Sequence, residues 1–175
     1  LPDDEVYDKL NDSLTRSLDN MKLEKVNLFL LHSQLIKDNY KLFKFDEMRA
    51  KSATTLSCFF NAAIPAFERL KQEGKIDHWG IGGLGQEAAI IQAVNHSKAP
   101  SAVQCIINPL NSAGAIGYVS EIFNPLAILS KCQQLDIPIL AIRAVQAGAL
   151  TSSMDRPPHE SGFDKTDFDD FDKAE

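Results

Sequence analysis

Small or polar residues follow four short apolar runs of this 175-residue sequence, at the points where the runs end. They are His32 and Ser33 after the first run, Gly82 and Gly83 after the second, Asn108 after the third and Arg143 after the fourth. A neutral imidazole donates a hydrogen bond to a carbonyl without adding charge, and a guanidinium stacks on planar groups or binds carboxylate or phosphate. Because the carboxyl ends of parallel strands meet at one edge, the sequence predicts a shared ligand-binding edge.

Each of these residues also has a simpler interpretation. A lone histidine at a strand end is more often a hydrogen-bonded structural group than a catalytic one. For Arg143, an ion pair with a neighbouring acid is the simpler explanation. The glycines of residues 80–85 fit a strand end at which two backbones come close.

The elements that would position these residues follow from the spacing of apolar side chains. The expected helices are residues 4–22, 60–73, 86–96 and 125–135, and the expected strands are residues 26–31, 76–84, 102–108 and 137–144. Pro65 is expected in the first turn of the second helix, where its missing N–H costs little. The continuous apolar run at residues 26–31 is typical of a strand buried on both faces of a parallel sheet.

This alternation predicts an α/β fold with right-handed crossovers and a parallel sheet. Two architectures remain open on the pattern alone, a doubly wound open sheet of the flavodoxin type and a closed eight-stranded barrel. The sequence holds neither a GxGxxG turn after the first strand nor a P-loop, so nucleotide binding of those two kinds is disfavoured.

Composition limits the function classes. The chain is 44% hydrophobic and carries a net charge of −6. This charge does not favour binding to nucleic acid or to an anionic membrane, which basic proteins bind. Its three cysteines are widely spaced and form no Cys/His ligand pattern, so neither a disulfide framework nor a metal site is expected. These features predict a soluble, cytoplasmic protein.

The ends of the sequence predict a partial chain. Residue 1 is Leu and stands directly before a helical pattern, and residues 162–175 form an acidic tail that stops within a charged segment. We therefore expect residues 1–175 to form one domain that is part of a larger unit, although an ordinary frayed terminus fits the tail as well.

Six segments, in order, resemble the aldo-keto reductase family. They are residues 10–18, residues 26–32 (VNLFLLH), residues 67–76 (FERLKQEGKI), residues 79–81, residues 104–110 (QCIINPL) and residues 140–151, which end in QAGALT. The resemblance implies an oxidoreductase with a (β/α)8 TIM barrel, of which this chain would hold about strands four to seven. It also implies hydride transfer between carbonyls and alcohols with NADP(H), or alternatively NAD(H).

The resemblance also implies roles for individual residues. His32 is the counterpart of the family's catalytic histidine, whereas the counterparts of its catalytic Asp, Tyr and Lys would precede Leu1. Gln104 would bind the nicotinamide carboxamide, and Ser33, Tyr40 and Asn108 would line the substrate pocket. The other expected cofactor-binding residues are Gly82, Gly83, Ile142, Arg143, Gln146 and Gly148.

The sequence departs from the family pattern at two places on the cofactor side. Gly82 and Gly83 stand where the family usually has Ser-Asn, and Ile142 stands where a tyrosine often stacks on the nicotinamide. The segment 33–57 corresponds to a loop that shapes the substrate pocket, in which Tyr40, Phe43 and Phe45 either line the pocket or pack under the loop.

A second function stays open beside the enzyme, namely a non-catalytic relative that serves as a regulatory or binding subunit. Because its proton donor would lie outside the chain, we expect the 175-residue chain alone to be inactive. We also expect a half-barrel with two unpaired strand edges to be poorly stable and to self-associate.

Overall fold

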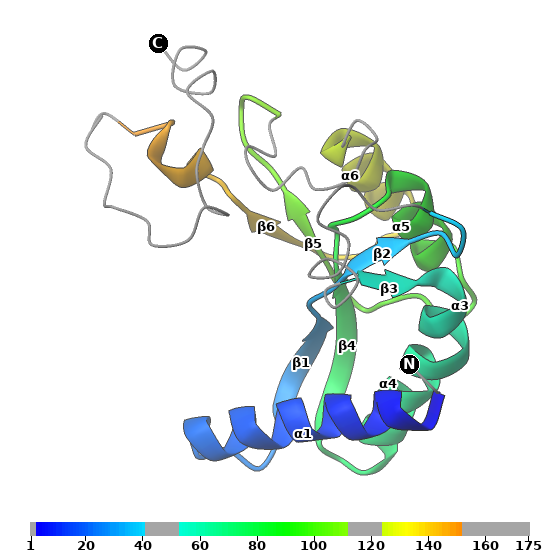
Figure 1. The fold of residues 1–175 in the computed structure, drawn as a ribbon. Coiled ribbons are helices and arrows are strands. Elements are labelled where there is room, and N and C mark those ends of the chain that lie inside the picture. Colours follow the sequence, from blue (N-terminus) through cyan, green and yellow to red (C-terminus); the bar gives the residue numbers. More distant parts are fainter. Residues whose placement is uncertain (1–2, 41–52, 112–123, 152–175) are drawn as a thin grey trace.

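The computed structural model describes residues 3–40, 53–111 and 124–151 (Figure 1), and Figure 1 labels its elements. In chain order they are α1 (Asp3–Met21), β1 (Val26–Leu31), β2 (Gln34–Ile36), β3 (Ala53–Thr55), α3 (Leu56–Cys58), the π-helix η1 (Phe59–Ala63), α4 (Ile64–Gln72), β4 (Ile76–Gly82), α5 (Glu87–Val94), β5 (Val103–Ile106), α6 (Pro125–Gln134), β6 (Ile139–Ile142) and the 3-10 helix η3 (Gln146–Gly148). The predicted alternation is confirmed, and most elements end one or two residues inside the predicted bounds.

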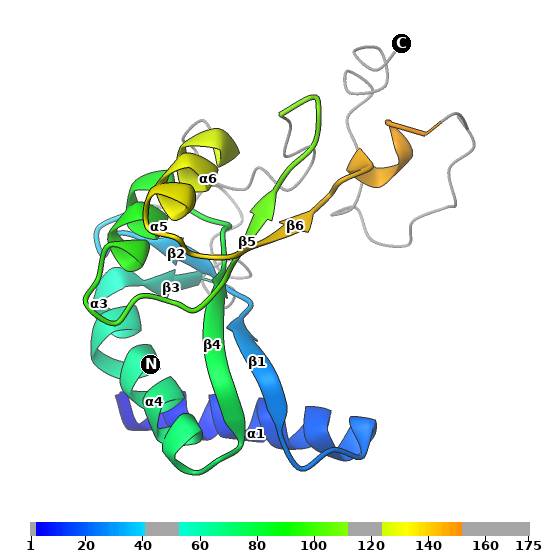
Figure 2. The ribbon, with the colours of Figure 1, turned by 180° about the vertical axis from the view of Figure 1, so that it is seen from behind.

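The main sheet has four strands in the order β1-β4-β5-β6, and every pair is parallel. Its strands all point away from α1, which runs across the amino ends of β1 and β4 (Figure 1). Seen from behind, α4, α5 and α6 lie together on one side of the sheet (Figure 2). The predicted parallel α/β arrangement is therefore confirmed. The carboxyl ends of the four strands lie at the same end of the sheet, which is called the carboxyl edge below.

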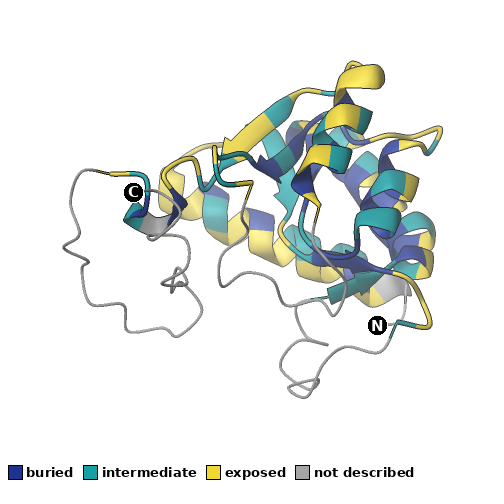
Figure 3. Ribbon diagram, turned by 90° about the horizontal axis from the view of Figure 1, so that it is seen from above, coloured by how far each residue is buried: buried dark blue, intermediate teal, exposed yellow. Residues whose placement is uncertain are grey.

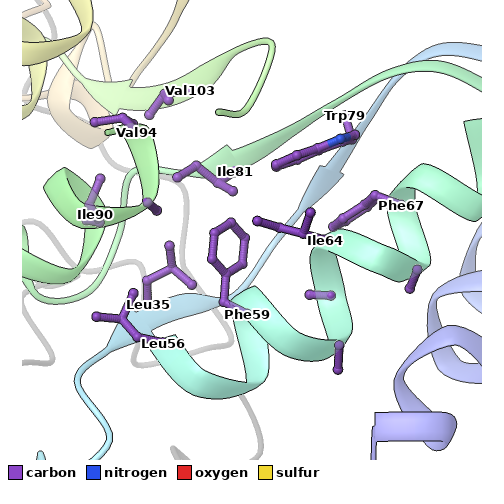
Figure 4. Close-up of a cluster of buried hydrophobic side chains, with 14 of the residues drawn as sticks. Leu35, Leu56, Phe59, Ile64, Phe67, Trp79, Ile81, Ile90, Val94 and Val103 are labelled. Atoms are coloured by element: carbon purple, nitrogen blue, oxygen red, sulfur yellow. The ribbon is translucent and has the colours of Figure 1, made fainter. Parts of the chain in front are cut away.

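The core lies between these helices and the sheet. The Phe67 ring stacks on the Trp79 indole at a centroid distance of 5.3 Å, and Phe29 packs edge-on against Phe67 at 5.8 Å. Figure 4 shows Phe59 and Ile64 from the helical layer facing Ile81 of β4. In Figure 3 the helices accordingly show buried residues toward the sheet and exposed residues toward the outside. This packing fixes β4 at the centre of the sheet.

The expectation that residues 26–31 are buried on both faces is wrong. Phe29 and Leu31 pack against the core, but every residue of β1 keeps some exposure, and Asn27 is exposed. Side chains alternate along a strand and only one face of β1 lies toward the helices, so Phe29 and Leu31 contact the core while the residue between them does not face it. By the same alternation Leu28 and Leu30 lie on the other face of β1, and both are only half-buried.

Pro65 lies in the first turn of α4, as predicted, but the helical segment that contains α4 begins earlier than residue 60. Thr55 caps it, with its hydroxyl accepting a hydrogen bond from the Cys58 N–H, and α3, η1 and α4 follow without a break. Pro65 thus lies well inside the segment. A proline has no N–H and crowds the carbonyl four residues earlier. The turn before it is a π-helix, in which the Ile64 N–H bonds to the carbonyl of Phe59.

A two-stranded parallel sheet of β2 and β3 lies between β1 and α3, and the sequence did not predict it. Strand β2 is attached to the end of β4 through Leu35, whose N–H bonds to the Leu84 carbonyl at 3.0 Å and whose carbonyl accepts from the Gln86 N–H at 2.8 Å. Gly85 makes this approach possible, since a Cβ there would lie 2.2 Å from the Leu35 oxygen. The β2–β3 sheet is therefore fixed to the carboxyl edge of the main sheet.

Neither a membrane-spanning helix nor a metal-binding cluster occurs in the described ranges. No helix within residues 3–40, 53–111 or 124–151 is long and apolar enough to cross a membrane. The same ranges hold no group of three or more His, Cys, Asp and Glu side chains placed to bind a metal ion.

Candidate active site

The residues singled out for chemistry lie at the carboxyl edge of the main sheet. His32 directly follows β1, Gly82 ends β4, Asn108 lies two residues beyond β5, and Arg143 directly follows β6. Because the four strands are parallel, their carboxyl ends lie on the same side, which is the placement the sequence predicts. Their roles in binding and catalysis stay predictions.

At the β1 end of this edge, His32 is exposed to solvent and the adjacent Ser33 is half-buried. The hydroxyls of Ser33 and Thr54 lie 2.8 Å apart and share a hydrogen bond, which joins the end of β1 to β3. An exposed imidazole is accessible to a small molecule. The backbone beside His32 is held in place by the β2–β3 sheet.

The two glycines at the end of β4 differ in the space around them. The Gly83 N–H donates to the Gln104 carbonyl at 2.6 Å, and a Cβ on Gly83 would lie 2.3 Å from that oxygen. A Cβ on Gly82 would meet only the Leu31 oxygen at 3.6 Å and the Ser33 oxygen at 4.0 Å, which are ordinary contacts. Gly83 is therefore needed for the close approach of two backbones, whereas Gly82 has room for a small side chain.

Gln104 lies on the face of the sheet that the helices do not cover. Its neighbours Val103 and Cys105 are fully buried in the core on the opposite face, while Gln104 itself is half-buried. Its register partners are Gly82 on β4 and Leu140 on β6. The amide therefore lies next to the small residue at position 82, on the same face as the half-buried Ile142.

Asn108, Arg143 and Gln146 form a hydrogen-bonded cluster at the ends of β5 and β6. The Gln146 Oε1 accepts from the Arg143 Nε at 3.1 Å and from the Asn108 Nδ2 at 3.3 Å. The Asn108 Nδ2 also contacts the Arg143 carbonyl at 3.4 Å. Arg143 and Gln146 have positive φ angles of 55° and 45°, a conformation that is uncommon for such residues.

Beyond this cluster, η3 turns the chain after β6. Gly148 has a φ of 97°, and a Cβ added to it would meet no described atom within 4 Å, so its backbone conformation and not crowding favours glycine there. The Gly148 N–H donates to the Val145 carbonyl at 3.0 Å. The half-buried Gly148 thus belongs to a tight turn that follows the edge.

The expected substrate pocket is described only in part. Tyr40 is half-buried, and its backbone N–H donates to the Lys37 carbonyl at 3.0 Å. Phe43 and Phe45 lie outside the described residues. The prediction that these aromatic residues line a pocket therefore stays a prediction.

Gln86 is a residue whose contribution sequence reasoning missed. It is 1% exposed, and its Oε1 accepts the Lys37 N–H at 2.8 Å, while its own N–H bonds to the Leu35 carbonyl. Gln86 therefore fixes the segment that follows β2. Its position directly after the glycine cluster is the only sequence signal that marks it.

The buried thiols next to the edge are poor nucleophiles. Burial raises the pKa of the Cys105 thiol to about 11, with a smaller contribution from the nearby Cys132. Burial also raises the pKa of the Cys132 thiol. Since the thiolate is the reactive form, neither residue is suited to covalent catalysis at neutral pH.

The family is established by comparison with known proteins. The sequence model of the Aldo/keto reductase family matches residues 3–171, and the chain belongs to this family. No curated protein matches the chain in sequence.

Several solved structures are similar in fold. MGS-M4, an aldo-keto reductase enzyme from a Medee basin deep-sea metagenome library, is 18% identical with a TM-score of 0.53, and the match covers 85% of this chain and 44% of that one. The Bombyx mori aldo-keto reductase AKR2E4, in complex with NADP, is 18% identical with a TM-score of 0.52 over 90% of this chain and 43% of that one. The silkworm enzyme AKR2E5 is 19% identical with a TM-score of 0.51 over 87% and 39%.

These matches decide between the two architectures. The alternating parallel strands and helices are part of a (β/α)8 barrel, as the resemblance predicts, and not an open doubly wound sheet. The chain spans less than half the length of the matched structures.

Proposed function

We propose that this chain is part of an NADP(H)-dependent oxidoreductase that interconverts carbonyl compounds and alcohols by hydride transfer. The observation that carries the proposal is the family match over residues 3–171, combined with an imidazole, an amide and a guanidinium at the carboxyl edge of one parallel sheet. In barrels of this kind that edge is where substrates and cofactors bind. NAD(H) is the alternative cofactor.

The residues of the edge fit different parts of such a reaction. When bound, NADP(H) would supply or accept the hydride. The Gln104 amide offers a donor and an acceptor together, which matches the paired groups of a nicotinamide carboxamide. The exposed His32 would donate a hydrogen bond to the substrate oxygen and orient it. Gly82 leaves space beside Gln104 for a planar ring.

Cofactor binding tests the proposal most directly. We would measure the Kd for NADP⁺ and NAD⁺ by isothermal titration calorimetry on the 175-residue chain and on a Gln104→Leu variant. The loss of a paired amide contact should weaken NADP⁺ binding about tenfold. Gln92, which is exposed on α5, provides the matched control as Gln92→Leu. Equal affinities in the two variants would remove Gln104 from the cofactor site.

A non-catalytic binding subunit is the second candidate. The observation that favours it is the close contact of Gly83 with the Gln104 carbonyl, which leaves no space for the side chain that the family usually has at this position. Aldehyde-dependent oxidation of NADPH separates the candidates. Cofactor binding without any turnover, when the family's Asp, Tyr and Lys counterparts are also present in the protein, would favour the binding subunit.

We also propose that the chain self-associates through its strand edges. Within the described residues β1 and β6 are the outer strands of the main sheet, and Leu140 on β6 is 40% exposed. Unpaired strand edges are templates for pairing with another chain. Sedimentation equilibrium should show mass increasing with concentration, and a monomer at every concentration would contradict this proposal.

We propose the cytoplasm as the location of the protein. Cys105 and Cys132 are buried free thiols, which reducing compartments preserve. Cell fractionation followed by immunodetection tests this proposal, and recovery in a secreted fraction would contradict it.

A further inference from the structure

The Arg143 guanidinium carries donors that no described residue accepts. A guanidinium has five N–H donors, and in the structure one of them, on Nε, donates to Gln146. The Nη2 atom is buried and has no hydrogen-bond partner among the described residues. A buried, charged donor without an acceptor is unfavourable, and native structures seldom retain one without a reason.

The simplest explanation of Arg143, an ion pair with a neighbouring acid, does not hold within the described residues. The ion pairs found there join Lys25 to Asp77, and Arg69 and Lys75 to Glu73. None of them involves Arg143, although the chain as a whole is acidic with a net charge of −6. The half-buried cation thus lies at the binding edge without a counter-ion from the described part of the chain.

Gln146 holds this cation in one orientation. Its side chain is fully buried, and its Oε1 is committed to the Arg143 Nε and the Asn108 Nδ2. Its backbone N–H also donates to the Arg143 carbonyl at 2.9 Å. With Nε bonded to Gln146, the Nη end of the planar guanidinium is the end that lacks an acceptor among the described residues.

We infer that Arg143 binds an oxyanion, a phosphate or a carboxylate, and that Gln146 is the positioning residue that orients its guanidinium toward that group. A planar guanidinium fork matches two oxygens of such an anion. The inference rests on the proposed function for the source of the anion, which is either a phosphate of the dinucleotide or a carboxylate on the carbonyl substrate.

Three probes and a set of variants test this inference. The Kd values of inorganic pyrophosphate, NADP⁺ and acetate would be measured by isothermal titration calorimetry at constant ionic strength. Arg143→Gln removes the charge, Arg143→Lys keeps the charge but removes the fork, and Gln146→Glu places a nearly isosteric carboxylate against Nε. Lys98→Gln, at an exposed residue, changes the net charge by the same amount as Arg143→Gln and serves as control.

Arg143→Gln should weaken the binding of at least one probe by about tenfold relative to Lys98→Gln. Arg143→Lys should lose part of that affinity, because an ammonium cannot make two parallel contacts. Gln146→Glu should lose as much affinity as Arg143→Gln, since a neutralised guanidinium no longer attracts an anion. A purely structural Gln146 would change the urea midpoint and leave the affinities for all three probes unchanged.

The three probes distinguish the two sources of the anion, the cofactor and the substrate. A loss confined to pyrophosphate and NADP⁺ assigns Arg143 to the cofactor, and a loss confined to acetate assigns it to a substrate carboxylate. If NADP⁺ does not bind the unmodified chain but pyrophosphate binds through Arg143, the proposed function fails and this inference stands. Equal affinities of Arg143→Gln and Lys98→Gln for all three probes, or no binding of any probe at millimolar concentration, would overturn it.

Discussion

The hydroxyl of Tyr7 on α1 lies 2.8 Å and 2.9 Å from the two carboxylate oxygens of Glu73, 66 residues further along the chain. The same carboxylate accepts from Lys75 at 2.8 Å and from the Arg69 Nε at 2.9 Å. Arg69 in turn lies over the Tyr7 ring, 3.7 Å from its centroid. This group joins α1 to the end of α4, at the amino ends of the strands and opposite the candidate active site.

The pH dependence of stability should reveal this group. Hydrogen bonds from Lys75 and Tyr7 lower the pKa of the Glu73 carboxyl to about 2 from its usual 4.5. A depressed folded-state pKa stabilises the protein above the unfolded-state value, and that contribution is lost as the pH falls toward 2. Glu73→Gln should therefore be less stable than the unmodified chain at about pH 7, and the difference should shrink at about pH 3.

Urea unfolding at the two pH values measures this difference. Glu24→Gln, at an exposed residue outside the helices, provides the matched control. A difference between Glu73→Gln and the unmodified chain that is the same at both pH values would show that the carboxylate charge does not matter.

The two glycines at the end of β4 should respond differently to the same substitution. In Gly83→Ala the new Cβ would lie 2.3 Å from the Gln104 oxygen, so the backbone must shift, at a cost of about 2 kcal/mol or more. Gly82→Ala meets only ordinary contacts and should change the free energy of unfolding by less than about 1 kcal/mol. Urea denaturation of both variants checks the difference, and equal costs would contradict it.

The aromatic core gives a third prediction. Phe67 is fully buried and stacks on Trp79, the only tryptophan of the chain. Phe67→Ala should lower the free energy of unfolding by about 3 to 5 kcal/mol through lost burial and an unfilled cavity. It should also change the tryptophan fluorescence of the folded state. Leu126→Ala, at a leucine that is 53% exposed, should leave both nearly unchanged.

Thiol labelling gives a fourth prediction. With its pKa raised to about 11, Cys105 would be about one part in a thousand thiolate at about pH 8. Iodoacetamide should therefore modify the half-buried Cys58 first and leave the buried Cys105 and Cys132 unmodified until the chain unfolds. Mass spectrometry of peptides from a native time course measures the order. Labelling of Cys105 as fast in the native as in the unfolded chain would refute the buried environment.

The parallel α/β order of the fold could be predicted from the sequence because strand and helix periodicities alternate clearly along the chain. The ends of the elements were less predictable, since apolar residues continue past the last paired backbone group. At residues 83–85 the chain no longer continues β4, and its backbone instead hydrogen-bonds to the Gln104 carbonyl and to the Leu35 backbone. Three-residue strands such as β2 and β3 carry no periodicity of their own and depend on partners distant in sequence.

The candidate site, like the fold, could be predicted from the sequence only in part. The position of Arg143 at a strand end follows from the pattern, and the structure places it there. Its hydrogen bond to Gln146 could not be predicted, because it needs positive φ angles at an arginine and a glutamine, which neither residue type signals. The different spaces at Gly82 and Gly83 likewise depend on the neighbouring strand and not on the glycines themselves.

The attachment of β2 and β3 has a consequence for how this protein can change during evolution. The hydroxyls of Ser33 and Thr54 share a hydrogen bond, and β2 pairs with β3 in register. The backbone N–H and carbonyl of Leu35 both hydrogen-bond to the chain that follows β4. The two ends of the segment between these strands are thus both anchored in this short parallel pair. Loop-closure entropy increases only slowly with loop length, so residues can be inserted or deleted there at small cost. The length of this connection can then change while the parallel-strand framework stays constant.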